Sequence, residues 1–195
     1  MPSGMANFDM AHSVLAGYEG GYSNHSADRG GETYKGIARK FHPSWIGWDL
    51  VDAAKASASF PRNLADSKQL AQYVVDFYRA EFWDRFSLDD MPQALATEIY
   101  EQTVNRGGVV RDLQKACNAL NYDKSKGRAF FNDLVIDGRF GGKTLSAVLA
   151  LCSNGDELHL VKLLNTAQGA HYMNEAASNV SQRQFMRGWL KRVDL

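Results

Sequence analysis

Glu19 is the residue whose type and position best suit proton-transfer chemistry. It ends a segment with an apolar face, where the negative end of a helix dipole and nearby side chains such as Tyr18 and Tyr22 disfavour a charged carboxylate. Both effects are expected to raise the pKa of Glu19. A carboxylic acid that is still protonated near neutral pH can donate a proton to a leaving-group oxygen. The alternative reading is a solvated glutamate at the end of a surface helix.

Asp28 and Thr33 follow Glu19 within a glycine-rich stretch. Five of the 17 glycines lie between residues 20 and 36. A second carboxylate opposite the first, with a hydroxyl beside it to place a water molecule, is the arrangement that an inverting glycosidase needs. The glycines would let the backbone come close to a bulky substrate. The alternative readings are an Asx turn for Asp28 and a turn or strand hydroxyl for Thr33.

The elements that must position these residues are mostly helical. Apolar residues recur at helical spacing in residues 7–19, where Gly20 and Gly21 stop the pattern, and again after Ser67, which with Asp66 is a candidate helix cap. The stretch from residue 20 to 36 predicts a turn-rich lobe with a short hairpin. Further helical patterns occupy the rest of the chain: residues 92–106, with Pro92 in the first turn, then 109–120, 145–149, 160–167 and 185–193. The predicted fold class is therefore mainly α, with a small glycine-rich irregular or β lobe after the first helix.

Composition bounds the class of protein. The chain has 195 residues, 45% of them hydrophobic, and 22 basic residues balance 22 acidic ones. This composition suffices for a sizeable core in one domain, or in one domain with a small module. A net charge of zero argues against a nucleic-acid binder held by phosphate contacts. We find no apolar stretch long enough to span a membrane and no pattern of a signal peptide.

The cysteines and histidines predict neither a disulfide framework nor a metal site. Cys117 and Cys152 are far apart and no histidine cluster accompanies them, so we interpret both as buried free thiols. The five histidines are scattered without the spacing of metal ligands.

The run EGGYSNHSADRGGETYKGI, residues 19–37, resembles the signature of glycoside hydrolase family 108. These are lysozyme-like N-acetylmuramidases of phages, prophages and bacterial secretion-associated loci. Later stretches are similar to further blocks of the family, in the expected order: residues 78–86, 103–107, 113–120, 136–144 and 188–193. The resemblance implies a lysozyme-like catalytic region at 1–103. It also implies a helical peptidoglycan-binding region at 104–195, packed on the first region as one compact unit.

The resemblance also implies roles for single residues. Glu19 matches the proposed catalytic acid, and Asp28 and Thr33 match the acidic and hydroxyl positions of the same signature. Asn105, in the Val-Asn-x-Gly block, matches an asparagine that can bind an N-acetyl group. The residue four places before it is Glu101, where the family often has Asp.

Aromatic side chains near these positions offer flat faces for sugar rings. We expect Tyr22 and Tyr34 to contact substrate, whereas Trp45 and Trp48 are more typical of a core. In the later half, Asp137–Gly141 predicts a tight turn, and Thr144 is expected to cap the next helix rather than to touch sugar.

The sequence therefore predicts an N-acetylmuramidase of lysozyme type. It would hydrolyse the β-1,4 bond between N-acetylmuramic acid and N-acetylglucosamine, with Glu19 as general acid and without a cofactor or metal. Two alternatives stay open: a lytic transglycosylase, and a non-catalytic peptidoglycan-binding or secretion accessory protein.

The expected partner is the glycan strand of peptidoglycan, with no nucleic acid and no stable membrane insertion, and we expect a monomer. We also expect synthesis in the cytoplasm and action on the bacterial cell wall. A holin, a dedicated secretion system or lysis would release the protein, as for a bacteriolytic endolysin.

Overall fold

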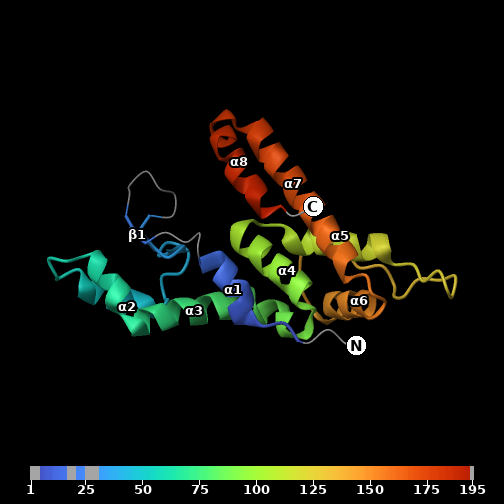
Figure 1. Cartoon of the computed structure of the whole chain (residues 1–195), viewed down its shortest axis with the longest axis horizontal. Coiled ribbons are helices and arrows are strands. Elements are labelled where there is room, and N and C mark those ends of the chain that lie inside the picture. Colours follow the sequence, from blue (N-terminus) through green and yellow to red (C-terminus); the bar gives the residue numbers. More distant parts are fainter. Residues whose placement is uncertain (1–4, 17–20, 25–30, 194–195) are drawn as a thin grey trace. The chain divides into compact units, whose positions relative to one another are not determined.

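The computed structural model describes residues 5–16, 21–24 and 31–193, and it divides into two compact units (Figure 1). We call His12–Trp83 the sheet unit. Met1–Ala11 together with Asp84–Leu195 form the helical unit. Helix α1 (Phe8–Ala16) contributes residues to both.

The sheet unit contains a small antiparallel sheet of β1 (Tyr22–Ser23), β2 (Thr33–Tyr34) and β3 (Ile37–Ala38), in that order. Tyr22 lies opposite Tyr34, and Ser23 lies opposite Thr33. The turn between β2 and β3 is Lys35-Gly36, with φ angles of 46° and 78°. A two-residue hairpin turn with positive φ at both positions matches the twist of its strands, and it favours glycine.

Two helices support the sheet unit. They are α2 (Gly47–Ala54) and α3 (Lys68–Phe82), joined through a 3₁₀ helix at Arg62–Asp66. The side chain of Ser67 accepts a hydrogen bond from Leu70 N, which confirms the predicted cap of α3. On the same helix, the hydroxyl of Tyr78 donates to Lys35 O at 2.9 Å and so fixes the hairpin turn on α3.

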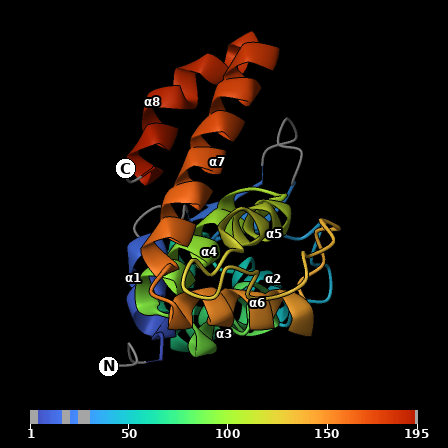
Figure 2. The same cartoon turned by 90° about the vertical axis from the view of Figure 1, so that its right-hand side faces the viewer.

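Helix α7 (Glu157–Ser178) is the backbone of the helical unit. It packs against α4 (Gln93–Asn105) and α5 (Val109–Leu120), and α5 also packs against α6 (Gly142–Ser153). Figure 2 shows α8 (Met186–Trp189) beside α7, where the Trp189 ring stacks on Tyr172 with centroids 5.2 Å apart. The remaining turns of 3₁₀ helix are Asp84–Phe86, Leu88–Asp90, Val180–Phe185 and Leu190–Arg192.

The core of the helical unit is aliphatic and lies between α4, α5 and α7. Leu95, Leu113, Leu160 and Leu164 are all fully or almost fully buried. Helix α4 ends before Gly107-Gly108, as predicted, and Gly108 has a φ of 83°, a conformation that glycine adopts without strain.

Residues 130–139 run without regular structure beside α5 and are fixed by side chains of that helix. Asn118 donates from Nδ2 to Leu134 O and accepts from Leu134 N. Asn121 accepts from the backbone N–H groups of Phe130 and Phe131 and donates to Phe131 O. These bonds replace the partners that a strand or helix would supply to the backbone. We call Gln114 and Asn118, together with Asn121 at the C-cap of the helix, the amide face of α5.

Three expectations about the fold are wrong in detail. Thr144 does not cap α6, because the helix begins at Gly142 and the Thr144 hydroxyl accepts a hydrogen bond from the buried Gln114. Cys152 is a free thiol but is partly exposed, whereas Cys117 is buried as predicted. The helix expected at residues 185–193 is interrupted, because α8 is followed by a 3₁₀ turn at Leu190–Arg192.

Candidate active site

Three of the predicted site residues lie on the first two strands of the sheet. Thr33 begins β2, Tyr22 begins β1, and Tyr34 follows Thr33. Glu19 and Asp28 lie outside the residues that the structure describes. Residues 25–30, between β1 and β2, are likewise outside the described ranges.

Glu32, just before β2, links that strand to β1. The Tyr22 hydroxyl donates to Glu32 Oε1 at 3.0 Å. Ser23 pairs with Thr33 in the sheet, so the chain that leaves β1 is tied to the chain that enters β2 by backbone and side-chain bonds. Sequence reasoning did not single out Glu32, although it lies inside the signature run.

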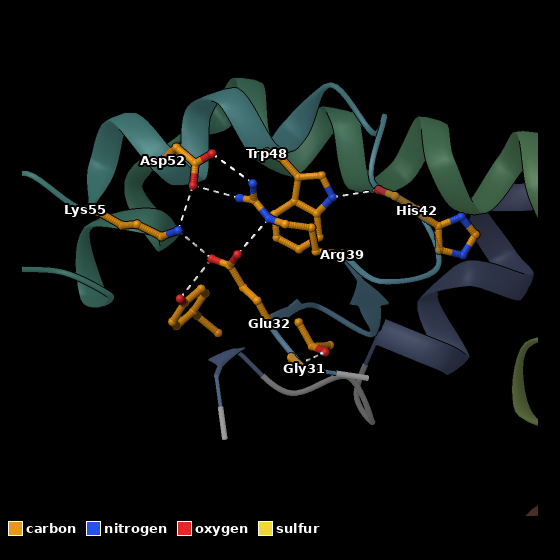
Figure 3. A network of polar contacts seen from close by, with 9 residues as sticks. Gly31, Glu32, Arg39, His42, Trp48, Asp52 and Lys55 are labelled. Carbon is orange, nitrogen blue, oxygen red and sulfur yellow. Dashed lines mark hydrogen bonds and ion pairs between the residues drawn. The ribbon is translucent and has the colours of Figure 1, made fainter. Parts of the chain in front are cut away.

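Glu32 belongs to a cluster of four charged residues, shown in Figure 3. Arg39 Nε lies 2.7 Å from Glu32 Oε2, at an angle that is not that of a hydrogen bond, and Lys55 Nζ lies 2.7 Å from Glu32 Oε1. Arg39 also holds both oxygens of Asp52, at 2.7 and 2.9 Å, and Lys55 reaches Asp52 Oδ1 at 2.7 Å. Two cations and two carboxylates balance, and we call these residues the charge cluster.

The charge cluster is built from elements that the sequence separates. Glu32 precedes β2, Arg39 follows β3, and Asp52 and Lys55 lie on α2 and just after it. The guanidinium of Arg39 also lies 4.4 Å from the centre of the Trp48 ring, which is buried as predicted. The only local signal of the cluster in the sequence is the Asp52–Lys55 pair, three residues apart on one helical turn.

The protonation states of the cluster suit a structural role. The hydrogen bonds from Arg39, and then from Lys55, lower the pKa of Asp52 to about 2. The bond to Asp52 raises the pKa of Arg39 and of Lys55. Burial, and then the bond to Glu32, raises the pKa of the Tyr22 hydroxyl. Asp52, Arg39 and Lys55 therefore stay charged and Tyr22 stays neutral around pH 7, so none of these side chains is poised to exchange a proton.

Thr33 and Tyr34 differ in what they offer a ligand. The Thr33 hydroxyl is partly exposed and donates to Gly31 O at 3.1 Å. Tyr34 is only 5% exposed, its ring stacks on Trp45, and burial raises the pKa of its hydroxyl. The described structure thus leaves little of the Tyr34 surface for a sugar. Its predicted contact with substrate stays a prediction.

Asn105 is the predicted site residue of the helical unit. It is the last residue of α4, its side chain is exposed, and its Nδ2 donates to Glu101 O at 2.8 Å. Its carbonyl oxygen forms no hydrogen bond within the described part of the chain, and it is the atom that would accept a bond from an N-acetyl group.

Within the described ranges, no group of three His, Cys, Asp or Glu side chains is placed to hold a metal ion. Among the helices in those ranges, none is long and apolar enough to cross a bilayer.

Similarity to a solved structure supports the fold class. The structure of Brucella abortus SagA superposes with a TM-score of 0.56 at 23% sequence identity, over 95% of this chain and 88% of that one. None of the curated proteins shows significant similarity to the sequence. The predicted class, mainly α and lysozyme-like with a small sheet, is confirmed.

Sequence families give the class of activity. Residues 12–107 match the glycosyl hydrolase 108 family, and residues 109–194 match a predicted peptidoglycan domain. The protein is thus a glycoside hydrolase of peptidoglycan that also carries a region for binding this polymer. The chain belongs to the glycosyl hydrolase 108 family. The predicted division at residues 103 and 104 stays a prediction.

Proposed function

We propose that the protein is an N-acetylmuramidase that hydrolyses the β-1,4 bond between N-acetylmuramic acid and N-acetylglucosamine. The observation that carries this proposal is the family match over residues 12–107, which includes the whole Glu19–Thr33 signature. Cleavage of this bond needs a protonated carboxylic acid on the leaving-group side and a second group that handles water or positive charge.

Glu19 is the proposed general acid, which protonates the leaving oxygen. Asp28 then either activates a water molecule or stabilises the oxocarbenium-like charge, and Thr33 orients that water. The description of Thr33 supports this role, because its partly exposed hydroxyl gives its proton to Gly31 O and keeps lone pairs for an incoming water.

The hydrogen bond between Tyr22 and Glu32 is a second observation in favour of this site, although neither side chain takes part in the proposed reaction. Glu19 lies three residues before β1, and Asp28 lies between β1 and β2. The fixed pairing of these strands holds Tyr22 and Thr33, two residues of the same signature, in defined positions. In the proposal, the Tyr22 ring contacts a sugar, Tyr34 contributes at most the edge of its ring, and Asn105 binds an N-acetyl group.

The test is mass spectrometry of the soluble products that wild type and Glu19→Gln release from purified peptidoglycan. We expect reducing-end muropeptides from the wild type, and a loss of about 100-fold or more in rate for the variant. Glu175→Gln, an exposed position on α7, is the matched control and should keep full activity. Equal rates for wild type and Glu19→Gln would exclude Glu19 as the acid.

The same products separate the two alternative functions. Products that end in 1,6-anhydromuramic acid would make the protein a lytic transglycosylase, since that enzyme uses the muramyl hydroxyl in place of water. A protein that pellets with peptidoglycan but releases nothing would be a binding or secretion accessory protein.

The bacterial cell wall is the proposed place of action, because peptidoglycan is found there, and bacteriolysis in the manner of a phage or prophage endolysin is the proposed role. Addition of the protein to bacteria whose outer layers have been permeabilised should lower their turbidity, and Glu19→Gln should not. A monomer remains our expectation for the active form, and light scattering on a sizing column would test it.

A further inference from the structure

A groove of about 830 Å³ lies in the helical unit, within the predicted peptidoglycan domain. Its sides are residues 130–135, the turn at Asp137–Gly141 and the first turns of α6. Sites for small ligands in proteins have volumes of about 300–1,000 Å³, so the groove can hold a short peptide or one to two sugars. No residue of this groove belongs to the sheet unit, and none is a candidate catalytic residue.

The groove is built before a ligand arrives. The amide face of α5 fixes one side through the bonds of Asn118 and Asn121 to residues 130–134. Asn121 also donates to Asp133 Oδ1 at 2.9 Å, which orients a carboxylate at the groove. A site whose walls are held in this way loses little entropy on binding.

Gln114 fixes the opposite side. Its buried side chain accepts from Gly138 N at 2.9 Å and donates to Asp137 Oδ1, also at 2.9 Å. Gly138 has a φ of 75°, and Arg111 covers the turn from α5 by donating to Ile136 O at 2.7 Å. The turn that presents Arg139 is therefore rigid.

The charges of the groove are of both signs, and Arg139 lies near enough to Asp137 to help lower the pKa of that carboxyl. Arg139 and Lys143 are exposed, and neither forms an ion pair with any residue that the structure describes. On the acidic side, the backbone N–H of Arg139, and then Gln114, lowers the pKa of Asp137 and keeps it ionised. Asp133 is the other carboxylate of the lining.

The charges of peptidoglycan are on its peptides rather than on its sugars. The lactyl carboxyl group of muramic acid is consumed in the amide bond to the stem peptide, and both sugars carry neutral N-acetyl groups. The stem peptide has free carboxylates and, where it contains a diamino acid, an amine. A groove with two exposed cations and two carboxylates therefore matches the stem peptide better than it matches the glycan.

We propose that this groove binds the stem peptide of peptidoglycan. Arg139 and Lys143 hold a stem carboxylate, Asp133 and Asp137 face the amine of the diamino acid, and the apolar side chains of Val135 and Phe140 receive alanine methyl groups. The N–H groups at the start of α6, which no side chain caps, add donors for the same carboxylate. The inference rests on the proposed function only in taking peptidoglycan as the polymer that the enzyme acts on.

Calorimetric titration of the full chain with the tripeptide L-Ala-γ-D-Glu-meso-diaminopimelate tests the proposal. The double variant Arg139→Gln/Lys143→Gln should bind the tripeptide with an affinity about 10-fold lower than that of wild type. The control Lys162→Gln/Arg187→Gln removes the same charge from exposed positions on α7 and α8 and should bind as wild type does. Amide shifts of Gly142 and Lys143 on addition of the tripeptide would place the ligand in the groove.

Three results would overturn the proposal: no binding of the tripeptide by wild type, unchanged binding by the groove variant, or an N-acetylglucosamine tetrasaccharide that shifts the same amides while the tripeptide does not. Digestion of peptidoglycan keeps this test apart from the proposed function. If the groove binds the stem, the groove variant should need more peptidoglycan for half-maximal rate, with kcat unchanged. Failure of the muramidase proposal would instead appear in the product masses of the wild type, whatever the titration gives.

Discussion

The sheet unit and the helical unit both hold a length of irregular backbone in place, but with different chemistry. In the sheet unit, the charge cluster of Glu32, Arg39, Asp52 and Lys55 fixes the entry to β2 from partly exposed positions. In the helical unit, the amide face of α5 fixes residues 130–139 through neutral side chains, two of which are at least 90% buried.

The difference between the two units shows that burial decides whether ion pairs or amide hydrogen bonds can hold an irregular segment. Ion pairs near the surface keep their charges hydrated in part, tolerate small displacements, and are weakened by salt. Buried amides carry no charge to desolvate, but each needs its partner within hydrogen-bond distance, so an error leaves an unsatisfied group in the core. The amide face should therefore be the more sensitive of the two to substitution, and the charge cluster the more sensitive to solution conditions.

The largest effect is expected for Gln114→Leu. The substitution leaves the Gly138 N–H and the Thr144 hydroxyl without their partner, and should lower the free energy of unfolding by about 2–3 kcal/mol. Urea unfolding measures it. Lys115→Leu, the neighbouring exposed position on α5, should change the same quantity by less than about 0.5 kcal/mol. Similar losses for the two variants would mean that the amide face does not hold the turn.

Gly138→Ala against Gly31→Ala sharpens the comparison at positions of positive φ, because a new Cβ at Gly31 would meet no atom within 4 Å. Both positions have positive φ, so alanine should cost about 1 kcal/mol at each. At Gly138 the new Cβ would lie 3.0 Å from Arg111 Cγ, so the cost should rise to about 2 kcal/mol as Arg111 is displaced. Thermal unfolding of the pair gives the difference. An equal loss at the two positions would contradict the close contact with Arg111.

Glu32→Gln should cost about 1–2 kcal/mol, because two cations lose their shared carboxylate while the position stays partly solvated. Hydrogen exchange at residues 31–39 should speed up, and exchange at 130–139 should not change. In 1 M salt the difference between variant and wild type should shrink, since screening weakens the ion pairs. A salt-independent difference would show that Glu32 acts through packing alone.

The smallest effect is expected for Asp52→Asn, and it depends on pH. Asp52 has a folded-state pKa of about 2, below its ordinary value of about 3.9, so its ionised form stabilises the fold above about pH 4. This contribution is lost as pH falls through about 2. Because the side chain is 47% exposed, the variant should lose only about 0.5 kcal/mol near neutral pH.

Asp49→Asn, an exposed position of α2 without an ion pair in the described chain, is the control for Asp52→Asn. Thermal unfolding at several pH values should give curves for wild type and Asp52→Asn that converge towards pH 2. A difference that stays constant over that range would remove the electrostatic explanation.

Elements whose information is local could be predicted from the sequence. The cap of α3 at Ser67 and the break after α4 at Gly107-Gly108 follow from residue type and apolar period. The amide face could not be found in this way, because Asn118 and Gln114 have partners 16 to 30 residues away. The same distance explains why the predicted cap at Thr144 is wrong, since nothing nearby in sequence indicates that Gln114 reaches it.

The candidate site likewise contains residues that the local sequence predicts and residues that only distant contacts bring together. Thr33 and Tyr22 could be found because they lie in one signature run, and the structure places both on the paired strands. The charge cluster joins residues up to 23 positions apart, from Glu32 to Lys55, through contacts that only the folded sheet unit creates. Glu19 and Asp28 stay predictions.

The spacing of the amide face also indicates where this chain can be lengthened. One extra residue between Gln114 and Asn121 would rotate the rest of α5 by about 100° and turn Asn121 away from Phe130 and Phe131. Residues 124–127, all exposed, lie after the last amide and before the held segment, so extra residues there would leave the register intact. An affinity tag or a reporter domain inserted at this place would extend the protein and keep the hydrogen bonds that hold the wall of the groove.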